Sequence, residues 1–148
     1  MYSHWDANLL VAGATLVAVA LCVLVHYEGL VLLSRWLSGR TEIQKRRKVL
    51  NGIFGVMGLH VAEIWIFGAT LWAVLHYPNA GAVSGLQALG LLDSVYLAAT
   101  TFTTVGFGDL APVGPVRFLS GTTALTGFVL IAWSASFTYL EMERYWRH

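Results

Sequence analysis

The sequence predicts an all-α membrane protein with three transmembrane helices. Apolar residues make up 57% of the 148 residues, and charged residues only 11%. The mean hydropathy is +0.65, and these values lie outside the range of ordinary soluble domains. Three apolar stretches each exceed the roughly 20 helical residues that span a bilayer. The net charge of +1 argues against binding to nucleic acid.

The predicted spans cover residues 7–33, 49–77 and 115–139. The first span does not read as a cleaved signal peptide, because no Lys or Arg precedes it and its apolar run is too long. It also lacks the series of basic residues that a voltage sensor needs. Cys22 is the only cysteine and lies in this span, so no disulfide can form within the chain.

The distribution of Lys and Arg predicts the orientation. Six of the nine basic residues lie in the short connection between the first two spans, which the positive-inside rule places in the cytoplasm. The N-terminus then lies outside, and the C-terminus, with Arg144 and Arg147, lies inside. We expect an integral protein of the plasma (cell) membrane whose basic connection contacts anionic lipid headgroups. The six residues are Arg35, Arg40, Lys45, Arg46, Arg47 and Lys48.

The outer connection between the second and third spans predicts a re-entrant segment. Residues 78–85 are rich in turn-forming residues and predict an exposed loop. Asp93 or Ser94 is expected to cap a helix of about ten residues that ends near Phe102. Such a helix reaches only about 15 Å, half of the hydrocarbon core, so it must enter the membrane and return. The backbone that follows it is tolerated there only against protein or a wet cavity.

Residues 103–109 read Thr-Thr-Val-Gly-Phe-Gly-Asp and follow Asp-Ser-Val-Tyr-Leu-Ala-Ala-Thr-Thr-Phe. This stretch resembles the pore loop and selectivity filter of potassium channels. The resemblance implies that backbone carbonyls, helped by positive φ angles at Gly106 and Gly108, coordinate dehydrated K⁺. The resemblance implies a selectivity filter made of Thr104, Val105, Gly106, Phe107 and Gly108. Within it, the K⁺ ions are bound at Thr104, Val105, Gly106 and Phe107.

The resemblance to two-span channels covers residues 49–148 as a pore domain, with an outer helix, pore helix, filter and inner helix. Residues 1–48 then form an additional span and its cytoplasmic connection. Because the chain has one pore loop and the filter needs four, a homotetrameric pore is implied. The implied function is passive, potassium-selective conduction without catalysis, without a cofactor other than K⁺ in the filter, and without a soluble ligand domain. A poorly selective cation channel of the same architecture is the alternative.

Other residues are assigned supporting roles on the same resemblance. Phe107 stands where the filter commonly has Tyr, and Thr100 stands where some members carry a carboxylate, so Asp109 lacks that partner. Tyr96 or Thr100 is expected to bond Asp109 instead, and the sequence does not choose between them. Gly127 lies near the usual hinge glycine of the inner helix, and close helix packing explains it equally well.

Four ionisable residues fall within the first two spans, where charge is costly. They are His26, Glu28, His60 and Glu63. An interhelical polar seam, a proton sensor that uses imidazole titration, and a zinc site all remain open. The difference in depth between the two pairs argues against the zinc site. A membrane metalloenzyme built on these four residues is the alternative to a channel.

Overall fold

The computed structural model describes residues 5–38 and 45–146. Three long helices dominate it: α1 (Trp5–Ser38), α2 (Lys45–Leu75) and α4 (Arg117–Trp146). All three are long and apolar enough to cross a membrane, which confirms the three predicted spans. The predictions for Arg40 and Arg147 lie outside the described residues, as do those for the side chains of Lys45, Arg46 and Arg144.

The long helices have mainly apolar sequences and contain no proline. All three prolines of the chain lie between helices, where their missing N–H group breaks no helical bond. Large side chains such as Leu16, Phe54 and Phe128 remain exposed on these helices. In a membrane protein this exposure is expected, because lipid or another subunit covers such side chains.

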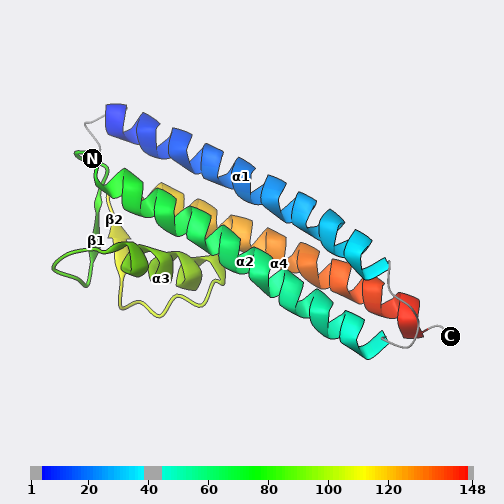
Figure 1. Ribbon diagram of the computed structural model, residues 1–148. Helices are drawn as coiled ribbons and strands as arrows, with labels where there is room; N and C mark the ends of the chain where they lie inside the picture. Colours follow the sequence, from blue (N-terminus) through cyan, green and yellow to red (C-terminus); the bar gives the residue numbers. More distant parts are fainter. Residues whose placement is uncertain (1–4, 39–44, 147–148) are drawn as a thin grey trace.

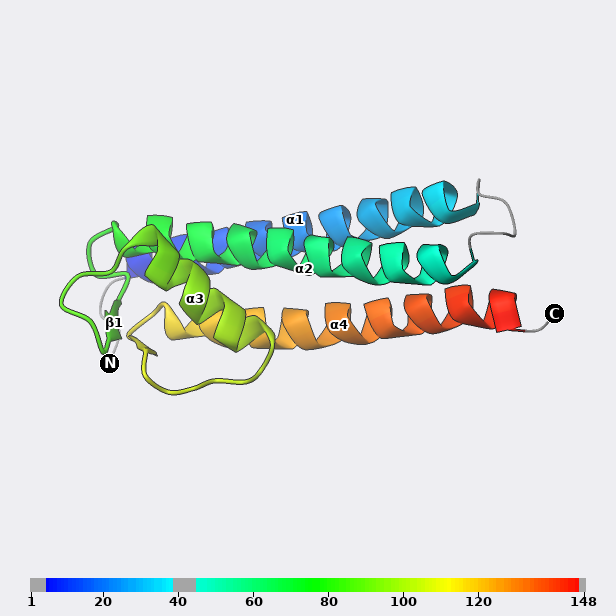
Figure 2. The ribbon, with the colours of Figure 1, turned by 60° about the horizontal axis from the view of Figure 1, so that its bottom comes forward.

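The three long helices pack side by side, and α1 contacts both α2 and α4 (Figure 1). The short helix α3 (Leu91–Phe102) and the strands β1 (Ala82–Ser84) and β2 (Ala111–Val113) gather at the end where α1 begins and α2 finishes. Figure 2 shows that α3 runs obliquely to the long helices, and that the chain after it loops outward before returning to α4. The structure therefore has the predicted short helix and loop between the second and third spans.

Helix α3 is held from behind by a small apolar core and by close backbone contacts. Leu97, Ala98 and Phe102 are buried together with residues of α2 and α4. A Cβ atom at Gly68 would lie 2.7 Å from the Cα atom of Val95. A side chain at this glycine would push α3 away from α2, so glycine permits the close approach.

The start of α3 differs from the prediction. The helix begins at Leu91 after Gly90, and neither Asp93 nor Ser94 is its N-cap. Asp93 lies at the third helical position, where its Oδ2 atom accepts a 2.9 Å hydrogen bond from the N–H of Gly90. The Ser94 hydroxyl donates to the Gly90 carbonyl at 3.2 Å. The acidic side chain thus supports the cap from inside the first turn, as in a capping box.

The outer connection also contains a two-stranded ladder that was not predicted. Within residues 78–85, expected to be only an exposed loop, β1 pairs antiparallel with β2, so that Val83 lies opposite Pro112. The N–H of Val116 donates to the carbonyl of Ala80 at 3.0 Å, and Ala80 is fully buried. Strands of three residues are too short to show a readable alternation of apolar and polar residues, so no local pattern predicts them.

Candidate functional site

The loop after α3, residues 103–109, is exposed over its whole length. Positive φ angles recur at every second residue: 59° at Thr104, 52° at Gly106 and 83° at Gly108. The two glycine values agree with the expectation from sequence. Thr104 is β-branched and rarely adopts this conformation, so its backbone is strained by about 1–3 kcal/mol. Strain of this kind concentrates at functional sites.

Hydrogen bonds tie the first part of the loop to the end of α3. The N–H of Thr104 donates to the carbonyl of Thr101 at 2.9 Å, and the N–H of Gly106 donates to the carbonyl of Thr100 at 3.0 Å. These bonds turn the chain back along its own helix. The first part of the loop therefore has a defined backbone path.

The far end of the loop is tied to α3 by a side-chain contact. The hydroxyl of Tyr96 donates to Oδ2 of Asp109 at 2.8 Å. The hydroxyl of Thr100 instead donates to the carbonyl of Leu97 at 3.1 Å. Of the two partners considered for Asp109, the structure places Tyr96 there. This hydrogen bond raises the pKa of the Tyr96 phenol above its ordinary value, because losing the proton would leave two negative groups in contact.

The centre of the loop has no cover within the described chain. The side chain of Val105 is 58% exposed and that of Phe107 is 72% exposed. A side chain at Gly106 or Gly108 would meet nothing within 4 Å. The loop therefore presents apolar side chains and polar backbone on the same exposed surface, although it is fastened at both ends.

Gly127 lies on α4 directly behind the end of α3. A Cβ atom at this position would overlap the carbonyl group of Phe102. Of the two roles considered for Gly127, close packing is the one with a visible contact. This glycine lets the last turn of α3, and with it the start of the loop, rest against the inner part of α4.

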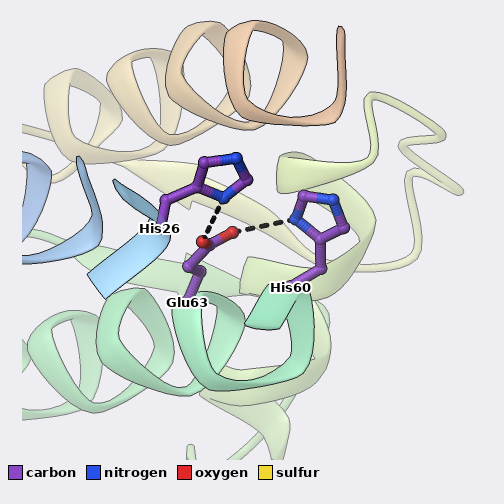
Figure 3. Close-up of side chains that lie close together, drawn as sticks. All are labelled: His26, His60 and Glu63. Atoms are coloured by element: carbon purple, nitrogen blue, oxygen red, sulfur yellow. Dashed lines mark hydrogen bonds and ion pairs between the residues drawn. The ribbon is translucent and has the colours of Figure 1, made fainter. Parts of the chain in front are cut away.

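A second polar site lies inside the helix bundle (Figure 3). Oε1 of Glu63 is 2.7 Å from Nδ1 of His26, and Oε2 of Glu63 is 2.9 Å from Nδ1 of His60. His26 and Glu63 are fully buried, and the side chain of His60 is 17% exposed. We refer to these three residues as the His–Glu–His cluster.

Glu28 does not belong to this cluster. Its side chain is exposed, and among the described residues the converging ligand atoms come from His26, His60 and Glu63. The sequence predicted that His26 and Glu28 lie at a different depth from His60 and Glu63. That prediction is wrong for His26, which lies at the same level as His60 and Glu63. Helices α1 and α2 cross so that His26 reaches the level of Glu63.

Two neighbours of the cluster were not assigned from the sequence. Ser134 of α4 places its Oγ atom 3.5 Å from Nε2 of His26, and Ser134 is buried. The ring of His60 lies 5.8 Å from that of Phe102, measured between centroids. A serine inside an apolar span is a weak signal for a polar partner, and the aromatic contact left no signal in the sequence.

The comparisons with known proteins agree with this architecture. Residues 59–142 match a protein family described as "Ion channel". The match covers more than half of the chain and includes α3, the exposed loop and nearly all of α4. The chain belongs to this ion channel family. Membership and the three apolar helices together make it an integral membrane protein.

The chain is also similar to individual proteins. The chain is 30% identical to Protein LctB of Geobacillus stearothermophilus over 96 residues, which is 65% of this chain and 72% of that protein. It is 36% identical to Protein LctB of Bacillus caldotenax over 55 residues, or 37% of this chain and 40% of the relative. It is 33% identical to Two-pore potassium channel 1 of Arabidopsis thaliana over 63 residues, or 42% of this chain and 17% of the relative. No solved structure matches the chain.

Proposed function

We propose that this ion channel is selective for potassium and conducts K⁺ passively down its gradient. The observation that carries the proposal is the exposed loop with positive φ at alternate residues. Such alternation turns successive carbonyls toward the same side of the chain, which gives the row of oxygens that a dehydrated K⁺ requires. The name of the Arabidopsis relative, a potassium channel, favours the same ion.

On this proposal the K⁺ ions are cargo, and they bind the oxygens of Thr104, Val105, Gly106 and Phe107, with Gly108 closing the row. The carbonyl end of α3 leads directly into the loop. The negative end of its dipole therefore favours a cation at the start of the row. Tyr96, Thr100 and Asp109 support the loop from behind. The chain then works without catalytic residues and without a cofactor.

The exposure of the loop argues for assembly. One row of carbonyls cannot replace the hydration shell of an ion, and Val105 and Phe107 have no cover in one chain. Four copies around an axis would surround the ion and cover these side chains. We therefore propose a homotetramer in which α4 lines the axis and α1 lies at the periphery. Residues 49–148 form the pore domain, and residues 1–48 carry the additional span.

The same proposal sets the orientation. The loop, α3 and the β1–β2 ladder lie at one end of the long helices, and that end faces outward in the plasma membrane. The connection between α1 and α2 is then cytoplasmic, and Arg47, which is exposed at the start of α2, lies at the level of anionic headgroups. The N-terminus is outside and the C-terminus is cytoplasmic.

Flux from liposomes tests selectivity. The purified chain is reconstituted with either a K⁺ gradient or a Na⁺ gradient, and the dissipation of each gradient is followed. We expect K⁺ to pass in preference to Na⁺, and Ba²⁺ to block the K⁺ flux. Equal K⁺ and Na⁺ flux would mean a poorly selective cation channel instead.

Native mass spectrometry of the detergent-solubilised chain tests the assembly. Four copies per particle are expected. A stable dimer as the sole conducting species would refute the tetramer.

A further inference from the structure

We propose that His26, His60 and Glu63 form a binding site for a transition-metal dication of the zinc class. This site is separate from the loop that we assign to potassium, and its ligands come from α1 and α2. Binding of the metal would fasten the additional span to the pore domain. The proposal rests on the geometry, burial and charge of the His–Glu–His cluster.

The three side chains already converge on a common point. One ligand atom from each lies within 4.8 Å of the others. Ligand atoms around a tetrahedral zinc ion are about 3.3 Å apart, given bonds near 2.0–2.1 Å. The contacts from Oε1 of Glu63 to His26 (2.7 Å) and from Oε2 of Glu63 to His60 (2.9 Å) must open by a few tenths of an ångström. Any pair of ligand atoms at the 4.8 Å limit must close by about 1.5 Å. Two imidazoles and one carboxylate are donors that zinc prefers, and three protein ligands leave a fourth position for water.

Burial and charge also favour a cation in this place. The carboxylate of Glu63 is fully buried in an apolar span, where an uncompensated charge is expensive. In the part of the chain that the structure describes, its ion-pair partners are the two imidazoles, which are uncharged unless protonated. A bound dication supplies the missing positive charge without requiring a proton on either ring.

The surroundings of the ligands fit a metal site. When Nδ1 of His26 binds a metal, Nε2 carries the remaining proton and faces Oγ of Ser134 at 3.5 Å. A second hydrogen bond of this type is what usually orients a metal-binding histidine. His60 is partly exposed while the other two ligands are fully buried. The side of His60 is therefore the entry route and the place for a water ligand.

The position of the site gives the metal a structural effect. His26 comes from α1, and both His60 and Glu63 come from α2. The ring of His60 also lies beside Phe102 at the end of α3. A ligand that binds only the folded arrangement stabilises it by mass action. We therefore expect zinc to raise the unfolding temperature of the whole chain.

Zinc titration of the full-length chain in detergent, after treatment with a chelator, tests the proposal. Isothermal titration calorimetry should give one zinc per chain, and the unfolding temperature should rise with zinc. His26→Gln and Glu63→Gln should abolish both effects. His76→Gln and Glu28→Gln are matched controls, because both residues are exposed and lie outside the cluster. Ser134→Ala should weaken zinc binding by about tenfold.

Two results would overturn the proposal. The first is a wild-type chain that takes up no zinc and gains no thermal stability, as expected if the cluster holds only an additional proton. The second is zinc binding that the cluster variants leave intact. If Glu63→Gln does not fold, His60→Gln replaces it, and X-ray absorption of the zinc-loaded wild type must report two histidine nitrogens. Because zinc binding is measured without ion flux, its failure leaves potassium conduction standing.

Discussion

The loop of residues 103–109 and the His–Glu–His cluster both hold polar groups within the helical region, and they are built in opposite ways. In the loop of residues 103–109 the backbone is exposed, and Val105 and Phe107 project from it without cover. In the His–Glu–His cluster the polar groups are side chains, and Glu63 contacts two imidazoles inside one chain. The apolar side chains of the loop are uncovered in a single chain, whereas the three side chains of the cluster contact one another within it.

This difference separates two uses of polarity in a membrane. Exposed backbone in a bilayer has to be covered by protein or by water, and under the proposed function other chains and an aqueous path cover the loop. Buried side chains that satisfy one another need neither, and they hold helices together. Changes in the loop should therefore affect conduction first, and changes in the cluster should affect stability first. The following variants test that division, from the largest expected effect to the smallest.

Gly106→Ala should abolish selective K⁺ flux. The residue has φ of 52° and a Cβ atom would meet nothing in the chain, so the effect comes from the backbone. The left-handed conformation costs about 1–2 kcal/mol per chain for a residue with a Cβ, and the cost would arise in each of the four chains of the proposed homotetramer. Gly13→Ala is the control, since Gly13 also has open space around it but lies within α1. Undiminished K⁺ flux in Gly106→Ala would break the link between this backbone and conduction.

Glu63→Gln should lower the free energy of unfolding by about 1.5–3 kcal/mol, the range for hydrogen bonds to a charged group. The amide keeps the shape of the side chain, but its NH₂ group cannot accept a hydrogen bond from an imidazole N–H. Thermal unfolding in metal-free buffer measures the change. The exposed carboxylate of Glu28 provides the control, and Glu28→Gln should change stability by less than about 0.5 kcal/mol. Equal effects of the two substitutions would mean that the cluster contributes no special stability.

Gly127→Ala should destabilise the chain by about 1–3 kcal/mol and also reduce K⁺ flux. The added methyl group overlaps the carbonyl of Phe102, so α3 and the loop must move together. Gly121→Ala on the same helix meets nothing within 4 Å and should be neutral or stabilising. This variant sharpens the comparison between the loop and the cluster, because Gly127 packs against Phe102 at the end of α3, where the loop begins. If Gly127→Ala lowers flux without lowering stability, a hinge at this glycine explains it better than packing.

Tyr96→Phe should have the smallest effect, about 0.5–1.5 kcal/mol, on the attachment of the loop. It removes the hydrogen bond to Asp109, and K⁺ flux should fall by about two- to tenfold. Because the pKa of Tyr96 is raised in the folded state, the bond persists below the ordinary tyrosine pKa of about 10 and is lost only above it. The flux difference should therefore be constant between about pH 6 and 9. Tyr77→Phe, at the same 38% exposure, is the control and should leave flux unaltered.

The sequence was sufficient for features that depend on local composition. The length and hydropathy of the apolar stretches predict the three spans. The segment before residues 103–109 is too short to cross the membrane, which predicts a short helix there. Positive φ at Gly106 and Gly108 was expected because glycine has no Cβ and adopts this conformation readily. Thr104 was not expected to share this conformation, because its own side chain disfavours it.

Features that depend on distant contacts escaped prediction. The pairing of β1 with β2 joins segments on either side of α3, and neither strand is long enough to show a pattern. The meeting of His26 with Glu63 depends on how far α1 and α2 are shifted along each other, which hydropathy does not encode. The choice of Tyr96 over Thr100 depends on which face of α3 points toward Asp109.

The ladder between β1 and β2 brings together the two ends of the segment from Ala82 to Val113, because Ala82 lies opposite Val113. Two kinds of contact set the position of this segment: the ladder at its two ends, and the packing of α3 against Gly68 of α2 and Gly127 of α4. The opposite end of α4 takes no part in that anchorage. Bending of α4 between Gly127 and its C-terminal end would consequently leave the contacts that hold the loop in place.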